Sequence, residues 1–280
     1  MFARVRDRFS ARICGALGVN ATESHLNAAL AMMNEPTGFA ALPVEQQERI
    51  RQSGNAIVHL AQQHAGGLII APPPSRDGFF ATGSYFILEL EGRYWLATAN
   101  HVVESFERAT ADDPAVKIQI GELMLGLTGR EVIRDDIADV CLVSISSVEY
   151  PVARVPALSA AAGWPPPGPR EGDYVAISGY PASIRERPTR RRVEFNALSA
   201  IYRVTQAGKH HCSCQFEREE WINFEGPPPP DPGTDLGGMS GGPVLMIGGL
   251  GFPVIGAISQ FESSFEILRI GLFQRPVFGG

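Results

Sequence analysis

The sequence predicts a mainly β protein in which two β-rich units follow a small helical extension. Short apolar runs separated by turn residues recur from about residue 79 to residue 258, a pattern typical of a β-sandwich or barrel. Thirty glycines and 22 prolines among 280 residues supply the turns that such a body needs. We therefore expect a helical extension at residues 1–66 and β-rich units at 67–163 and 164–280.

The extension is expected to hold two or three helices. Apolar residues recur at helical spacing in residues 2–13, with arginines between them. A second helix is expected after Thr22, and a third from Pro43 towards His64, where Gly66-Gly67 ends it. The first helix is basic and amphipathic, as helices on anionic membrane surfaces are. We favour its packing on the following domain and expect no membrane partner.

The β-rich region reads as short strands separated by turns such as Glu91-Gly92. The expected strands are 79–80, 85–88, 94–96, 116–120, 140–145, 174–178, 193–204, 211–216, 244–247 and 254–258. The Pro-rich segment 164–169 divides this region near its middle, which makes it a natural linker between the two units.

Charge and cysteine usage limit the classes of partner and compartment. A net charge of −6 argues against nucleic acid, because phosphate contacts need basic surface. Cys14 and Cys141 lie far apart, and Cys212 and Cys214 are too close in sequence to pair well. The first residues lack the apolar core of a secretory signal, and no apolar run approaches the ~18 residues of a membrane span. We expect a cytoplasmic location.

The stretch GGMSGGPV at residues 237–244 sets Ser240 between glycine pairs. Glycines allow positive φ and close backbone approach, so a tight turn can direct its N–H groups into one small space. That arrangement suits a nucleophilic hydroxyl beside an oxyanion site. The same composition also serves as a plain turn between strands, so a base and an acid are needed to decide.

The chain offers both groups. His101 follows the apolar run LATAN, and Asp139 precedes the apolar run VCLV. A single histidine or aspartate at a strand end is ordinarily structural, but the order histidine, aspartate, serine in these contexts predicts a nucleophile with its base and orienting acid. Asp135 and Asp136 are rival acids, and we prefer Asp139 because the apolar strand follows it directly.

These motifs resemble those of trypsin-like serine proteases. LATANHVV resembles the TAAH region of that family, ADVCLV is similar to its DIAL strand, and GGMSGGPV resembles its G-D/N-S-G-G-P loop. The segment 82–87 and Gly179-Tyr180-Pro181 resemble motifs of the HtrA-like bacterial branch. The resemblance spans about residues 68–275 and leaves the helical extension outside.

The resemblance implies two antiparallel six-stranded β-barrels and a serine endopeptidase acting on protein or peptide substrates without metal or cofactor. Ser240 would attack the scissile carbonyl, His101 would act as base and then acid, and Asp139 would orient the imidazole. The backbone N–H groups of Gly238 and Ser240 would form the oxyanion hole.

Two positions depart from the family pattern. Met239 stands where secreted trypsins carry an aspartate that pairs with a freed N-terminus, so that activation route should be absent. Asn100 stands where an alanine normally precedes the histidine, and its amide needs hydrogen-bond partners if buried.

The resemblance also implies which residues bind substrate, but in less detail. The family's primary pocket has its base six residues before the serine, at Thr234, which would suit a small or medium uncharged side chain. Asp235 could instead favour a basic side chain. Ser259 and Gln260 are expected on the strand edge along which substrate backbone binds.

Two clusters remain outside this scheme. His210 to Cys214 contains soft metal ligands but lacks C-x₂-C spacing, so we expect strand residues of alternating exposure. The arginines of residues 185–192 indicate a solvated hairpin tip, with steering of acidic partners as the alternative. Two further functions stay open: an inactive protease fold that binds peptides, and a latent protease regulated by a partner through the N-terminal helices.

Overall fold

The computed structural model describes residues 41–72, 81–160, 164–189, 192–216, 231, 233–248 and 252–274. The first two helices expected in the extension, the strand expected at 79–80 and the prolines 227–230 lie outside these residues. Side chains 187–192, which include most of the arginines in the predicted basic hairpin, are likewise outside.

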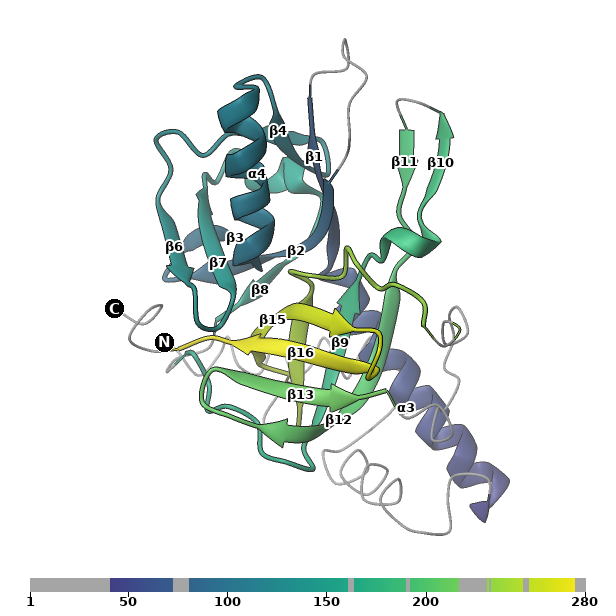
Figure 1. The fold of residues 1–280 in the computed structure, drawn as a ribbon. Coiled ribbons are helices and arrows are strands. Elements are labelled where there is room, and N and C mark those ends of the chain that lie inside the picture. The colour runs from purple at the N-terminus through teal and green to yellow at the C-terminus, as the bar shows by residue number, and fades with distance from the viewer. Residues whose placement is uncertain are drawn as a thin grey trace.

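The first unit is an eight-stranded sheet that curves as a half-barrel (Figure 1). Its strands are β1 (Gly66–Ala71), β2 (Ala81–Leu90), β3 (Arg93–Ala99), β4 (Lys117–Ile120), β5 (Leu123–Leu125), β6 (Val132–Asp135), β7 (Val140–Ile145) and β8 (Ala157–Ser159). Their order is β5-β4-β1-β2-β3-β7-β6, and β8 pairs with β2 in parallel. The resemblance implied a six-stranded barrel here, but the short end strands β5 and β6 do not pair with each other.

The second unit is a closed six-stranded barrel. Its strands are β9 (Tyr174–Gly179), β12 (Leu198–Ala207), β13 (His211–Gln215), β14 (Pro243–Ile247), β15 (Val254–Glu262) and β16 (Ile267–Leu272). A hairpin of β10 (Glu186–Thr189) and β11 (Arg192–Glu194) projects from it (Figure 1). The mainly β class is confirmed, and so is the hairpin predicted for the arginine-rich segment.

Local sequence explains the strands that were predicted. The turn between β2 and β3 is made by Glu91 and Gly92, both with positive φ (52° and 75°), as tight hairpins require. The single strand predicted at 193–204 is wrong: β11 ends at Glu194, and a separate strand, β12, begins at Leu198. Strands β1, β5, β6, β8 and β16 were not predicted, chiefly because most are short or begin with glycine.

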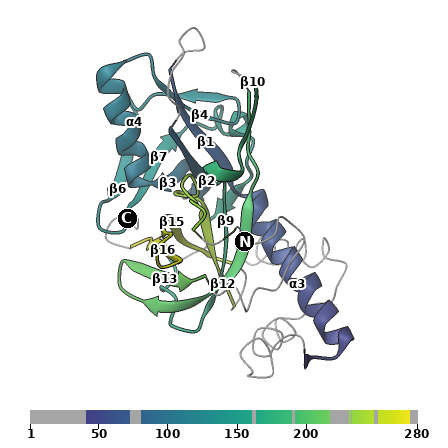
Figure 2. The ribbon, with the colours of Figure 1, turned by 45° about the vertical axis from the view of Figure 1, so that its right-hand side comes forward.

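Two helices lie at opposite ends of the described structure (Figure 2). Helix α3 (Val44–Gln63) confirms the third helix of the extension and packs against β9 and β12. Helix α4 (Asn100–Asp112) was not predicted. It directly follows β3 and buries Val102, Val103 and Phe106 against the first sheet. The sequence does contain apolar residues at helical spacing in this helix. It was not predicted because the apolar residues of β3 run directly into it.

One apolar cluster joins both units. Phe86 of β2 packs edge-to-face on Phe273, with 6.2 Å between ring centroids, and Trp164 packs on the same ring at 4.8 Å. Ile57 and Ala61 of α3 belong to this cluster. The described helices contain none long and apolar enough to cross a bilayer. The cytoplasmic location stays a prediction.

Candidate active site

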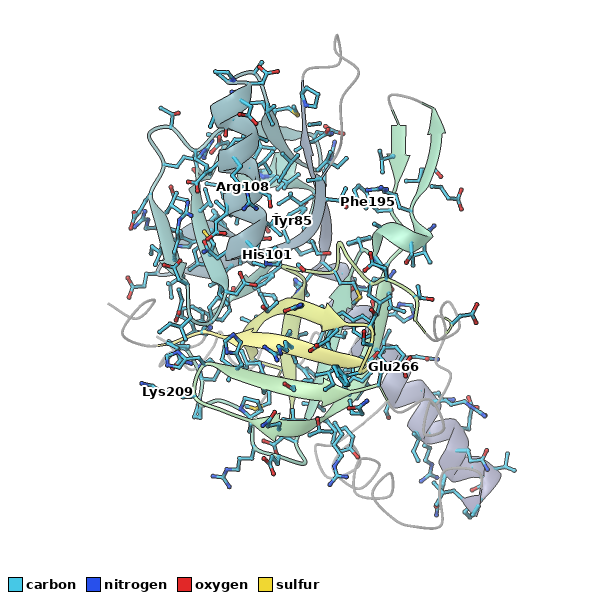
Figure 3. All side chains as sticks on the ribbon, in the orientation of Figure 1. Tyr85, His101, Arg108, Phe195, Lys209 and Glu266 are labelled. Carbon is cyan, nitrogen blue, oxygen red and sulfur yellow. The ribbon has the colours of Figure 1, made fainter. Side chains whose placement is uncertain are left out.

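The predicted catalytic side chains come from turns and element ends at the border of the two units. His101 is the second residue of α4, rather than the last residue of a strand as the sequence suggested. Asp139 ends the turn between β6 and β7, and Ser240 lies in the turn before β14. Figure 3 shows His101 below α4, above the strand β15 that carries Ser259.

His101 and Asp139 form a two-point contact. The ring atom Nδ1 lies 2.8 Å from Asp139 Oδ2, and the backbone N–H of His101 donates to Oδ1 at 2.9 Å. The backbone N–H of Asn100 donates to the Asp139 carbonyl at 3.1 Å. When Nδ1 donates its proton to the carboxylate, the neutral ring keeps Nε2 as a proton acceptor. The start of α4 and the β6–β7 turn are therefore held together at three points.

The environment favours the ionised form of Asp139. Burial opposes ionisation, but hydrogen bonds from His101 and from the Ser259 hydroxyl, at 2.7 Å, outweigh it and lower the pKa of Asp139. The contact from Ser259 was missed by the sequence reasoning, which expected that residue only on the substrate strand. No local motif could reveal it, because the two residues meet only through the fold.

The rival acids are engaged elsewhere. Asp135 Oδ1 accepts the N–H groups of Ile137 and Ala138, so this carboxylate shapes the turn. Asp136 Oδ1 accepts the side-chain amide of Asn100 at 3.0 Å. Of the three aspartates, Asp139 is the one that contacts the His101 ring.

Asn100 has the hydrogen bonds that the sequence required of it. The residue is 3% exposed, and its Nδ2 donates to Glu104 and Asp136 at 3.0 Å each. This amide fastens α4 to the turn that carries Asp139.

Ser240 reaches the pair through Ser259. Its hydroxyl donates to the Ser259 carbonyl at 2.9 Å. Among the hydrogen bonds of the described residues, none joins Ser240 directly to the His101 ring. Ser259 thus contacts both groups, with its hydroxyl on Asp139 and its carbonyl on Ser240.

The serine turn leaves two backbone donors available. In a planar trans peptide the C=O and N–H groups point in opposite directions. The Gly237 carbonyl accepts from Ala182 N–H at 2.7 Å, and the Met239 carbonyl accepts from Gly242 N–H at 3.0 Å. The N–H groups of the following residues, Gly238 and Ser240, point away from those contacts. Within the described part of the chain, neither donates to a backbone carbonyl.

Met239 anchors the turn by burial. It is 1% exposed and belongs to the core of the barrel. A Cβ at Gly179 would lie 3.1 Å from the Met239 Cβ, so the glycine of the Gly-Tyr-Pro motif leaves room for it. Apolar packing of Met239 therefore fixes the turn. An ion pair at this position would need a charged side chain, which Met239 does not have.

The residues predicted to bind substrate are placed as follows. Thr234 is half-buried, and Asp235 is exposed with Oδ1 accepting the Gly237 N–H at 2.8 Å. Pairing of β15 with β14 ends before Ser259, whereas Gln260 and Phe261 still pair with β16. Among the strands that the structure describes, none pairs with residues 259–262 on the side away from β16. The specificity assignments of these residues stay predictions.

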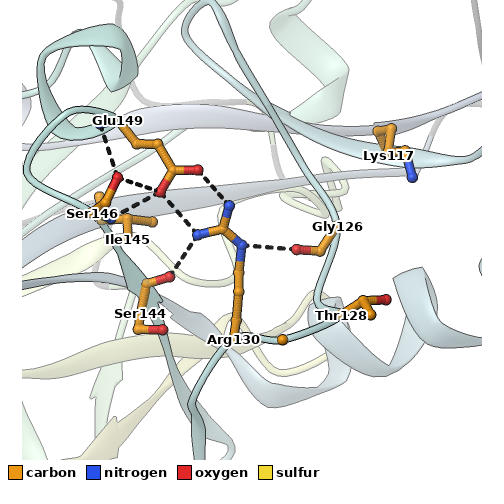
Figure 4. Close-up of a pocket in the computed structure, with 9 residues that line it drawn as sticks. Lys117, Gly126, Thr128, Arg130, Ser144, Ile145, Ser146 and Glu149 are labelled. Atoms are coloured by element: carbon orange, nitrogen blue, oxygen red, sulfur yellow. Dashed lines mark hydrogen bonds and ion pairs between the residues drawn. The ribbon is translucent and has the colours of Figure 1, made fainter.

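The other clusters have structural explanations. In the pocket of Figure 4, Arg130 binds Glu149 and the carbonyls of Gly126 and Ser144, and this ion pair lowers the pKa of Glu149 to about 2. Cys212 and Cys214 point into the barrel core, and Ser213 between them is half-buried, as alternating strand residues are. Among the described residues, no three side chains are grouped to hold a metal.

Comparison with known proteins gives a family. A model of the trypsin-like peptidase domain matches residues 81–249. No curated protein sequence matches the chain. Similar solved structures include a protease from M. tuberculosis in its active form, with 17% identity over 81% of this chain and 85% of that one, at a TM-score of 0.43.

A thermostable serine protease from an extremophilic microorganism shares 15% identity over 76% of this chain and 91% of that one, at a TM-score of 0.41. The serine protease domain of the Sesbania mosaic virus polyprotein shares 13% identity over 75% and 88%, also at 0.41. The HtrA-like branch stays a prediction. The family model spans more than half of the chain, from β2 to the strand after Ser240, and the chain therefore belongs to the trypsin-like peptidase domain family.

Proposed function

We propose that the chain is a serine endopeptidase that uses Ser240 as nucleophile, His101 as general base and acid, and Asp139 as the orienting acid. The observation that carries the proposal is the contact of the Asp139 carboxylate with both the ring and the backbone of His101. It fixes the ring with Nδ1 on the acid, which leaves Nε2 to take a proton.

In this mechanism the Ser240 hydroxyl exchanges the Ser259 carbonyl for His101 Nε2 and attacks the substrate carbonyl. The negative charge on the tetrahedral oxygen is stabilised by the N–H groups of Gly238 and Ser240. His101 then gives its proton to the leaving amine, and water releases the acyl group by the same steps. Asp139 stays ionised throughout and stabilises the imidazolium.

Substrate binding follows from the edge of β15. An extended peptide can add as a strand along residues 259–262, because no described strand pairs with this part of β15 on the side away from β16. Its N–H groups would compete with Ser240 for the Ser259 carbonyl, which would free the hydroxyl for His101.

Ser240→Ala tests the nucleophile. We expect it to lower cleavage of a casein-type substrate by about 10⁴-fold or more and to abolish labelling by a fluorophosphonate probe. Ser159→Ala, an exposed serine on β8, is the matched control and should label like the wild type. Labelling that persists in Ser240→Ala would refute the assignment.

The two alternative functions give different results. An inactive peptide-binding module would show measurable peptide affinity with no labelling of the wild type. A latent protease would gain activity when residues 1–40 are removed. The truncation should stop there and keep α3, because Ile57 and Ala61 belong to the shared core. Equal rates for the full chain and residues 41–280 would exclude latency through that segment.

A further inference from the structure

Ser84 is a fully buried polar residue of β2 that contacts the serine turn of the other unit. Its exposed fraction is 0%. Its backbone N–H donates to the Ser240 carbonyl at 2.8 Å, and its hydroxyl donates to the Gly238 carbonyl at 2.7 Å. The same hydroxyl accepts the Tyr180 N–H at 2.9 Å. A buried hydroxyl with one donor and one acceptor partner has a fixed direction.

Gly238 is the point of the turn that most needs such a contact. Its φ is 98°, and without a side chain both of its flanking peptide planes can rotate at low cost. The plane before it is held by Ala182 through the Gly237 carbonyl. The plane after it is held by Ser84 through the Gly238 carbonyl. The Gly238 N–H belongs to the first of these planes. Holding the second plane limits the rotation about the Gly238 Cα that would turn this N–H away.

There is no room for a side chain at Gly238. A Cβ there would lie 2.8 Å from the Tyr180 carbonyl and 3.1 Å from the Ala182 N–H. The turn therefore cannot be stiffened by a side chain at this position, and Met239 brings no charge. Hydrogen bonds from outside the turn are the remaining means of orientation. The Ser84 hydroxyl is the side chain of the first sheet that makes such a bond to Gly238.

We propose that Ser84 is a positioning residue for the oxyanion hole, in place of the ion pair that Met239 cannot make. The inference rests on the proposed function, in which the Gly238 N–H stabilises the tetrahedral oxygen. Because Ser84 belongs to β2, docking of the two units aligns the donor at the same time as it brings His101 and Ser240 together.

Ser84→Ala removes the hydroxyl and keeps the backbone contact to Ser240. We expect kcat to fall about 10- to 100-fold, less than complete loss of an oxyanion donor, with KM changed by less than about twofold. The affinity of a peptide aldehyde, which binds as a tetrahedral adduct, should fall in proportion to kcat. Ser199→Ala is the matched control, because it removes a part-buried hydroxyl pair between Ser199 of β12 and Ser178 of β9 and should leave kcat unchanged.

The outcomes distinguish a wrong role for Ser84 from a wrong proposed function. A wild type that is neither labelled nor active overturns the proposed function, and the inference with it. A labelled wild type whose Ser84→Ala variant keeps full kcat and aldehyde affinity overturns only the inference. If Ser84→Ala does not fold, Ser84→Cys takes its place, since a thiol has similar shape and donates weakly. Unchanged kcat in that variant would equally overturn the inference.

Discussion

Asp139 lies in the left-handed backbone region, with φ at 56°, which aspartate tolerates better than most residues. That conformation ends the turn after β6 and lets the carboxylate face both donors of His101. The Ser259 hydroxyl supplies a third donor to the same group. An acid held at so many points keeps the imidazole in one orientation, and the charge that results has a measurable effect on stability.

Ser259→Ala tests that charge. Loss of the hydroxyl should raise the pKa of Asp139 towards its ordinary value and cost about 1–2 kcal/mol at neutral pH. A lowered folded pKa stabilises above the unfolded pKa, near 3.9, and this stabilisation is lost as pH falls through the folded value. The stability gap between wild type and Ser259→Ala should therefore be largest above pH 4 and should shrink below it.

The measurement is urea denaturation from pH 2.5 to pH 7, with Ser199→Ala as the control. A gap that stays constant over that range would mean that Ser259 contributes packing rather than charge stabilisation. The hydrogen bond that the control removes joins Ser199 to Ser178, which does not ionise over this range, so its gap should not depend on pH.

The candidate catalytic residues could be predicted from the sequence, but the residues that hold them in place could not. His101, Asp139 and Ser240 lie in local motifs whose apolar flanks are recognisable on their own. Ser84 and Ser259 are ordinary strand residues, and their contacts join segments far apart in the chain. Such contacts depend on strand register and on the docking of two units, which no local pattern encodes.

Helix α3 ends in a contact that ties the extension to the first unit. His64 is 8% exposed, and its Nδ1 lies 2.9 Å from the Pro156 carbonyl. The Tyr180 hydroxyl donates to the Ala65 carbonyl from the barrel. The helix could be predicted from Pro43 and its apolar spacing. Its contacts with both units could not, because Pro156 and Tyr180 are distant in sequence.

His64 should make stability depend on pH. Burial lowers its pKa, and the hydrogen bond to Pro156 opposes this without outweighing it. A lowered folded pKa gives full stability above the unfolded pKa of about 6.5 and a loss as pH falls through the folded value. We expect His64→Gln to flatten the decline in Tm between pH 7 and pH 5.

The control is Gln63→Ala, which changes an exposed residue without an ionisable group at the end of the same helix. It should leave that decline unchanged. Calorimetric scans of the three proteins at half-unit pH steps provide the comparison. Equal slopes in wild type and His64→Gln would show that other groups cause the acid sensitivity.

The two units and α3 share one core, although the sequence suggested three separate segments. The shared cluster contains Phe86 and Trp95 from the first sheet, Leu245 and Val254 from the barrel, and Ile57 from α3. Trp164, in the segment expected to be a linker, is 9% exposed and packs on Phe273 in the same cluster. The prolines therefore mark a connection between the units, and Trp164 at its start is packed into the shared core.

A shared core predicts one cooperative unfolding transition. Neither unit can open without exposing apolar side chains that the other buries, so partly folded states should be scarcely populated. Leu96 lies in a cluster confined to the first unit, and Ile177 in one confined to the second. We expect Leu96→Ala and Ile177→Ala each to lower a single Tm by about 5–10 °C.

Differential scanning calorimetry gives the test, with equal calorimetric and van't Hoff enthalpies as the sign of one transition. Val148→Ala, an exposed residue of the first unit, is the control and should leave Tm unchanged. If two transitions appeared and Leu96→Ala moved only one, the units would be independent in stability. The alignment of Ser240 with His101 and Asp139 would then depend on the weaker unit, and activity would be lost at the lower of the two temperatures.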